Sequence, residues 1–228
     1  AGHGSRPNAE NAVTRLVGAL HRIAAHEWPV SLTPAVRAFL ERTGAALGVP
    51  VDLSSSDGVD ATVAALGPAG SLVVPTVRNS TTPTMLDAGY KVNVIPSTAT
   101  AQVDVRVLPG TEESLFAALD ELLGEGVTRE FVAHQPPVQA PVDSPWFTAM
   151  ADALRAEDPE AVVVPYCLGG GTDAKAFAQL GIDNYGFAPL WLPKGFPYRA
   201  MAHGVDERVP VEGLHFGTRV LSRFLATA

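Results

Sequence analysis

The chain has a single cysteine, few basic residues and no long apolar run, and each shortage excludes a class of protein. Cys167 has no second cysteine to form an intrachain disulfide, which fits a reducing, cytoplasmic compartment. Lys and Arg number 16 against 24 Asp and Glu, a net charge of −8, so we expect no nucleic-acid partner. Every apolar run is too short to span a bilayer and no signal peptide is recognisable, so we expect no membrane partner.

The composition that is present is that of a globular protein, with 46% hydrophobic and 18% charged residues. The 228 residues can form one large domain or two small ones. The chain opens on Ala1-Gly2-His3-Gly4-Ser5 without an initiator Met, and we expect that further residues precede it.

Hydrophobic periodicity predicts helices and strands on both sides of a proline-rich passage, and therefore an α/β fold. Helices are expected at residues 12–23, 34–47, 111–123, 144–156, 174–180 and 210–225. Strands are expected at residues 72–79, 93–106, 127–133, 161–166 and 182–187. Residues 54–58 read as a turn or loop. The proline-rich residues 135–141 predict a boundary that divides the chain into residues 1–135 and 136–228.

The segment that carries most information is the expected strand at residues 93–106. Apolar and polar residues alternate along it with the period of a half-buried strand. Asn93 then lies at one end and Arg106 at the other. Because a guanidinium forks onto planar carboxylates, the strand could carry a carboxylate clamp. An ordinary amphipathic strand with a polar outer face is the alternative.

Two of the six histidines, His3 and His203, lie in glycine-flanked loops, where functional imidazoles are often found. A zinc site needs three or four convergent ligands, and the sequence alone assembles no complete set. Residues 169–174 fit the glycine fingerprint for dinucleotides, but the acidic residue expected about 20 positions later is absent. The same turn could bind any anion through its backbone N–H groups.

Five motifs follow one another in order over almost the whole chain. They are Gly2-His3-Gly4-Ser5-x-Pro7-Asn8, Asn93-Val94-Ile95-Pro96 with Asp104-Val105-Arg106, Gly170-Gly171-Thr172-Asp173-Ala174, Gly186-Phe187-Ala188-Pro189 and His203-Gly204-Val205-Asp206-Glu207-Arg208. Together they resemble the zinc metallopeptidases that include aminoacylase, acetylornithine deacetylase, succinyl-diaminopimelate desuccinylase and the carboxypeptidase S type. No single motif decides this, whereas five in this order are specific.

The resemblance implies a catalytic α/β domain with two zinc ions and an inserted lid and dimerisation domain of the ferredoxin-like βαβ type. Residues 1–135 would be this lid without its first strand. Residues 136–228 would be the C-terminal part of the catalytic domain. The resemblance also implies a homodimer formed through the lid.

The resemblance further assigns roles to single residues. His203 matches the last zinc ligand, and His3 matches the lid histidine that crosses the dimer to polarise the scissile carbonyl. Asn93 and Arg106 match lid residues that bind the carbonyl and the carboxylate of the substrate. The backbone pocket for the same carboxylate is matched by Gly170, Gly171 and Thr172.

The implied reaction is hydrolysis of an amide bond in an N-acyl amino acid or a small peptide. Two zinc ions, or cobalt or manganese in their place, would activate the attacking water. The remaining ligands and the catalytic Glu of the family are not in this sequence, so we expect these 228 residues alone to be inactive. Two alternatives stay open: a non-catalytic dimerisation or binding module of the same ancestry, and a dinucleotide-binding oxidoreductase.

Overall fold

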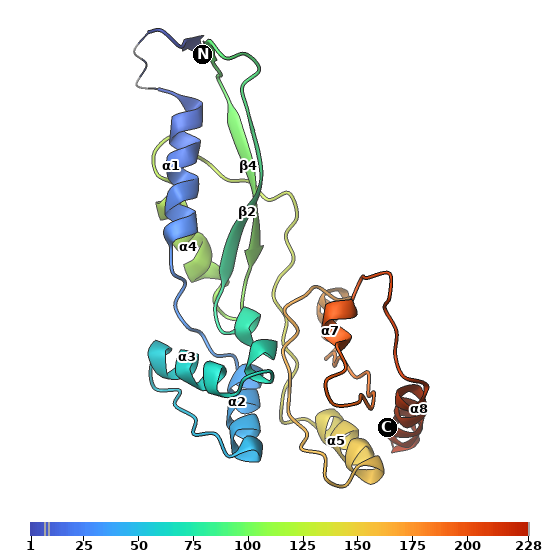
Figure 1. Cartoon of the computed structure of the whole chain (residues 1–228). Helices are drawn as coiled ribbons and strands as arrows, with labels where there is room; N and C mark the ends of the chain where they lie inside the picture. Colours follow the sequence, from blue (N-terminus) through green and yellow to red (C-terminus); the bar gives the residue numbers. More distant parts are fainter. Residues whose placement is uncertain (7, 9, 228) are drawn as a thin grey trace.

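A computed structural model describes residues 1–6, 8 and 10–227. The described residues combine helices with four strands, all of which lie before residue 107, and this mixture confirms the α/β class (Figure 1). In order they are β1 (Gly2–His3), α1 (Ala12–Ala25), α2 (Pro34–Leu47), α3 (Ser56–Ala65), the 3₁₀ turns η1 (Gly70–Leu72) and η2 (Val74–Thr76), β2 (Ser80–Ala88), β3 (Val94–Ile95), β4 (Ala99–Arg106), α4 (Glu112–Leu123), α5 (Pro145–Glu157), α6 (Ala174–Ala178), α7 (Tyr198–Met201) and α8 (Val211–Thr227). Within this described part, no helix combines the length and the apolar content needed to cross a membrane.

A long antiparallel hairpin of β2 and β4 organises the first half of the chain. The pairing runs from Ser80 opposite Arg106 to Ala88 opposite Ala99, with a bulge between Pro83 and Met85. The predicted alternation of β4 is confirmed, since its alanine and valine side chains are half-buried while most of the polar ones are exposed. Helices α1 and α4 lie along the hairpin, as Figure 1 shows.

The first hydrophobic core lies between these two helices and the hairpin. Its buried members are Ile23, Trp28, Leu115 and Leu119. The indole N–H of Trp28 donates to Thr81 Oγ1 at 3.0 Å, so the polar atom of this buried ring is paired with the hairpin. The core therefore fixes β2 against both helices.

The second core joins α2 and α3 to a segment from the second half of the chain. Leu40 and Val36 of α2 are fully buried there, and Val59 of α3 packs against them. Val164 and Cys167, more than 100 residues later, pack on the same cluster. Burial in this cluster raises the pKa of the Cys167 thiol, which lowers the fraction of the nucleophilic thiolate.

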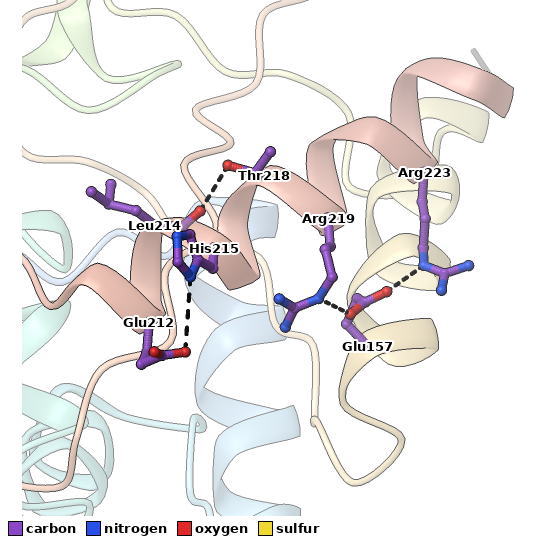
Figure 2. A network of polar contacts seen from close by, with 7 residues as sticks. All are labelled: Glu157, Glu212, Leu214, His215, Thr218, Arg219 and Arg223. Atoms are coloured by element: carbon purple, nitrogen blue, oxygen red, sulfur yellow. Dashed lines mark hydrogen bonds and ion pairs between the residues drawn. The ribbon is translucent and has the colours of Figure 1, made fainter.

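Helices α5 and α8 form a third group, and two arginines tie them together (Figure 2). Arg219 Nε donates to one carboxylate oxygen of Glu157 at 2.6 Å, and Arg223 Nε donates to the other. The Glu157 side chain is only 10% exposed. These two hydrogen bonds, Arg219 first, hold the pKa of the Glu157 carboxyl below its usual value.

Several expected strands are not strands in the structure. Residues 72–79 contain the end of η1, all of η2 and an isolated bridge from Arg78 to Val30, and β2 begins only at Ser80. Pro75 suits a first helical turn, and Thr76 Oγ1 donates to the Val73 carbonyl at 3.0 Å. Residues 54–58, expected as a loop, begin α3, whose N-cap Ser55 accepts from the Gly58 N–H. Residues 127–133, 161–166 and 182–187 form no ladder with any described segment.

The packing of residues 127–133 explains one of these differences. Phe131 contacts Phe116 of α4 edge to face, with ring centroids 5.1 Å apart. Arg129 lies over the Phe116 ring and donates to Asp120 of the same helix. Side-chain contacts to a helix thus hold this segment, where the sequence pattern predicted backbone pairing in a sheet.

Leu40→Ala should lower the free energy of unfolding by about 2–5 kcal/mol, because it removes buried methyl groups and leaves a cavity. Leu47 provides the matched control, since it lies in the same helix and is 58% exposed. Leu47→Ala should change the free energy by about 0.5 kcal/mol or less. Urea unfolding of the three proteins measures both effects, and equal losses would show that α2 is not packed as described.

Glu157→Gln should destabilise the chain at neutral pH and progressively less in acid. The folded pKa of Glu157 is lowered, so its contribution is present above the unfolded pKa of about 4.3 and is lost as pH falls through the folded pKa. Urea unfolding over a pH series measures the difference in the free energy of unfolding between parent and variant. Asp152→Asn, on the same helix but with only a 3.3 Å contact to Arg155, should show a much smaller gap. A gap that stays constant into acid would contradict the assignment.

Candidate functional site

The short ladder of β1 and β3 brings His3 to Asn93. His3 pairs with Val94 in the ladder, and the Gly4 N–H donates to the Asn93 carbonyl at 2.9 Å. The two side chains meet, with His3 Nε2 3.3 Å from Asn93 Nδ2. Both residues are exposed. Two residues 90 positions apart in sequence therefore form one polar pair beside the tip of the hairpin.

The other nitrogen of the His3 ring contacts Ser5, a residue that the sequence interpretation did not single out. The Ser5 N–H donates to His3 Nδ1 at 3.2 Å, and Ser5 Oγ lies 2.7 Å from the same atom. The Arg6 N–H donates to the His3 carbonyl at 3.0 Å and closes a turn. A hydroxyl residue two positions after a loop histidine was the available signal, since Ser commonly bonds to groups two residues away.

Arg106 lies at the opposite end of the hairpin. It is the last residue of β4, seven positions beyond Ala99, which corresponds to about 23 Å along a strand. Its guanidinium forks onto Asp104, with Nε to Oδ1 at 2.6 Å and Nη2 to Oδ2 at 2.8 Å. The structure therefore does not bring Arg106 together with His3 and Asn93. The contact with Asp104 was available from sequence, because residues i and i+2 of a strand share a face.

His203 lies in an exposed loop in the second half of the chain. It follows α7 closely, and α7 is in the opposite half of the molecule from the N-terminus, as Figure 1 shows. Among the described residues, it is the one non-glycine residue with a positive φ, at 64°. Its N–H donates to Glu207 Oε2 at 3.1 Å. The structure therefore keeps His203 far from the pair of His3 and Asn93 within one chain.

The glycine-rich loop at residues 170–172 is open to solvent. Gly170, Gly171 and Thr172 are all exposed, and a Cβ on Gly171 would meet no atom within 4 Å. Thr172 Oγ1 accepts from the Ala174 N–H at 3.3 Å. The loop leads into α6, but residues 161–166 before it form no strand with any described segment. The strand that a dinucleotide fingerprint requires before its loop is thus not built here.

The described residues do not fit a complete metal site. No group of three or more His, Cys, Asp or Glu side chains among them is placed to hold a metal ion. Glu207, the acidic side chain in contact with the His203 loop, is already engaged by the His203 N–H. A zinc site needs three or four protein ligands, so His203 would supply one member of a larger set.

Comparison with known proteins identifies the family of this chain. A family profile described as the peptidase dimerisation domain (M20_dimer) matches residues 1–127, which is more than half of the chain. The chain belongs to the M20 peptidase dimerisation family. This confirms the relationship to metallopeptidases that the sequence motifs predicted.

Named relatives of this M20 chain include acylases and hydrolases. Aminoacylase-1 of Pongo abelii is 32% identical over 152 residues, covering 60% of this chain and 35% of that protein. Human N-fatty-acyl-amino acid synthase/hydrolase PM20D1 is 24% identical over 238 residues, covering all of this chain and 47% of that protein. The chain thus spans less than half the length of these relatives.

Two solved structures share the fold of the M20 chain. The M20 family metallo-carboxypeptidase Sso-CP2 of Sulfolobus solfataricus gives a TM-score of 0.62 at 19% identity, covering 98% of this chain and 54% of that one. The di-peptidase Dug1p of Saccharomyces cerevisiae gives 0.51 at 14% identity, covering 95% and 48%. At such identities the likeness supports the α/β fold alone.

The lack of an assembled ligand set predicts that the 228-residue chain retains no stoichiometric zinc after dialysis. One exposed imidazole holds zinc far more weakly than a set of three or four ligands. Metal analysis of the parent chain and of His203→Ala should therefore return the same low zinc content. One zinc per chain that disappears in His203→Ala would contradict this expectation.

Proposed function

We propose that this chain is the lid and dimerisation region, together with the C-terminal part of the catalytic domain, of a metal-dependent hydrolase. Its substrate would be the amide bond of an N-acyl amino acid or a small peptide. Residues 1–135 would form the lid and residues 136–228 the catalytic part. The contact between His3 and Asn93 carries this proposal, with the M20 family membership as its support.

The contact between His3 and Asn93 suits stabilisation of a carbonyl oxygen. Their side-chain nitrogens, 3.3 Å apart, are close enough for N–H groups on both to donate to one oxygen atom. Negative charge grows on that oxygen when an amide is attacked, and such donors lower the barrier because they are already in place.

Substrate selection would use groups that hold a carboxylate. Arg106 binds the carboxylate of Asp104 in a forked geometry, and this supports a role for its guanidinium in holding a carboxylate. We propose that it exchanges Asp104 for the carboxylate of a substrate. The backbone N–H groups at the open turn would hold the same carboxylate: Gly170, Gly171 and Thr172.

A homodimer would bring the separated groups together. Within one chain the N-terminus and α7, which His203 follows closely, lie in opposite halves (Figure 1). A second copy would therefore place the lid of one subunit over the catalytic part of the other. Among the described residues, β2 pairs only with β4, which leaves one edge available for another strand. Exposed apolar side chains on or near that hairpin support an interface: Met85, Leu86, Tyr90 and Val92.

The metal site would be completed by polypeptide beyond this sequence. We propose two zinc ions, or cobalt or manganese in their place, with His203 as the ligand from this chain. Exposed apolar side chains in the second half favour a further layer of protein over them: Val162, Phe177, Leu180, Ile182, Val205 and Val211. We also propose a cytoplasmic location, which rests on the single cysteine.

His3→Ala tests the proposed function in a protein that carries this chain and a complete metal site. Loss of a donor to the developing oxyanion should lower kcat by about 10²–10³-fold with little change in KM. Hydrolysis of an N-acyl amino acid measures this, and His21→Ala, on the exposed side of α1, should leave kcat unchanged. Equal turnover in parent and His3→Ala would favour a non-catalytic dimerisation or binding module.

Leu86→Lys tests the homodimer. A lysine on an edge strand opposes strand pairing, so the dimer dissociation constant should rise about tenfold or more. Sedimentation velocity over a concentration series measures the constant, with Val17→Lys on the exposed face of α1 as the matched control. A parent chain that stays monomeric at every concentration would contradict the proposal.

A further inference from the structure

Three contacts surround the imidazole of His3, and they do not all allow the same proton position. The Ser5 N–H donates to Nδ1, and Ser5 Oγ lies beside the same nitrogen. Nε2 faces the side-chain amide of Asn93. A neutral imidazole has one N–H and one acceptor nitrogen, so the contacts together select a tautomer.

The backbone N–H of Ser5 is the group that decides. A main-chain N–H donates and cannot accept, so the nitrogen that it faces carries no proton. Nδ1 is therefore the acceptor and Nε2 carries the hydrogen. The Ser5 hydroxyl adapts to either state, because it can donate or accept. The Asn93 amide adapts as well, since a half-turn of its side chain exchanges oxygen for nitrogen.

We propose that Ser5 is a positioning residue that fixes His3 in the Nε2–H tautomer. In the opposite tautomer, hydrogens on Nδ1 and on the Ser5 nitrogen would face each other at the 3.2 Å separation of those atoms. The Nε2–H state satisfies the backbone and hydroxyl contacts at once. It also places the Nε2 hydrogen beside Asn93 Nδ2, 3.3 Å away, where both groups can donate to one substrate oxygen.

The tautomer matters for the function proposed above, on which this inference rests for its catalytic meaning. Nε2 is the atom on the Asn93 side, where the carbonyl oxygen of a substrate would be held. Only the Nε2–H state presents a hydrogen there without first moving a proton. Ser5 therefore keeps His3 ready to donate, and donors that need no reorganisation are the effective ones in such sites.

Nitrogen-15 NMR of the 228-residue chain tests the tautomer directly. At alkaline pH, where imidazoles are neutral, long-range correlations from the ring protons report which nitrogen is protonated. The signals of His3 are those that vanish in His3→Gln. His21, exposed on α1, is the solvated reference. We expect the ratio of Nε2–H to Nδ1–H at His3 to exceed that at His21 roughly fivefold. An equal ratio, or an excess of Nδ1–H, would overturn the proposal.

Three variants separate the contributing groups. Ser5→Ala keeps the backbone N–H and should keep the His3 ratio within about twofold. Asn93→Ala should also leave the ratio unchanged, because Asn93 follows the tautomer. Ser5→Pro removes the N–H and should bring the ratio to that of His21, with interstrand contacts from His3 to Val94 as the check that β1 stays paired. If Asn93→Ala brings the His3 ratio to that of His21, the proposal is overturned, even if Ser5→Pro loses the ladder of β1 and β3.

Kinetics in a protein with the complete metal site separates this inference from the proposed function. Ser5→Ala loosens the ring through loss of one hydrogen bond and should lower kcat about fivefold or less, with KM unchanged. If NMR finds the Nε2–H tautomer of His3 but His3→Ala keeps full activity, the role of Ser5 in fixing the tautomer stands. The catalytic role of His3 is then refuted. The reverse result, a catalytic His3 without a tautomer preference, would refute the role of Ser5.

Discussion

Antiparallel pairing of β2 with β4, buried on one face by α1 and α4, is the constraint on which the first half of the structure depends. The register from Ser80 opposite Arg106 to Ala88 opposite Ala99 fixes where the connecting residues 89–98 fall. Those residues include Asn93, and the strand β1 reaches them from the N-terminus. The contact between His3 and Asn93 is therefore exposed to solvent, yet the hairpin beneath it is anchored in a packed core.

Local pattern predicted most of the helices and β4 but missed α3 and α7, and it was a poor guide to strands elsewhere. Helix signals such as the cap Ser144 and the following Pro145 act within a few residues, so the sequence alone reveals them. A strand forms only where another backbone offers a ladder. Residues 161–166 have the apolar composition of a buried strand, but Val164 packs on the α2 and α3 core and no described backbone pairs with the segment.

For the residues proposed for function, the sequence likewise revealed single residues but not the contacts between distant segments. His3 and Asn93 were each identified from a motif, but their contact depends on a ladder between segments 90 residues apart, which no local pattern encodes. Ser5 was overlooked although it is two residues from His3, because its role lies in a main-chain N–H that every residue type except proline possesses. The role of Arg106 in binding a substrate carboxylate stays a prediction, and its partner within the chain is Asp104.

The bulge in β2 has a mechanical consequence. Pro83 has no N–H to donate and the register shifts before Met85, so the regular pairing of β2 with β4 is interrupted at this point. Beyond that point the arm continues for about 15 Å, four to five residues of strand. A flexion of about 10° there would displace the tip by about 2.6 Å, which exceeds the roughly 1 Å of misplacement that can already lower an enzymatic rate about 100-fold. The position of the hairpin tip therefore depends on how rigid the hairpin is at the bulge between Pro83 and Met85.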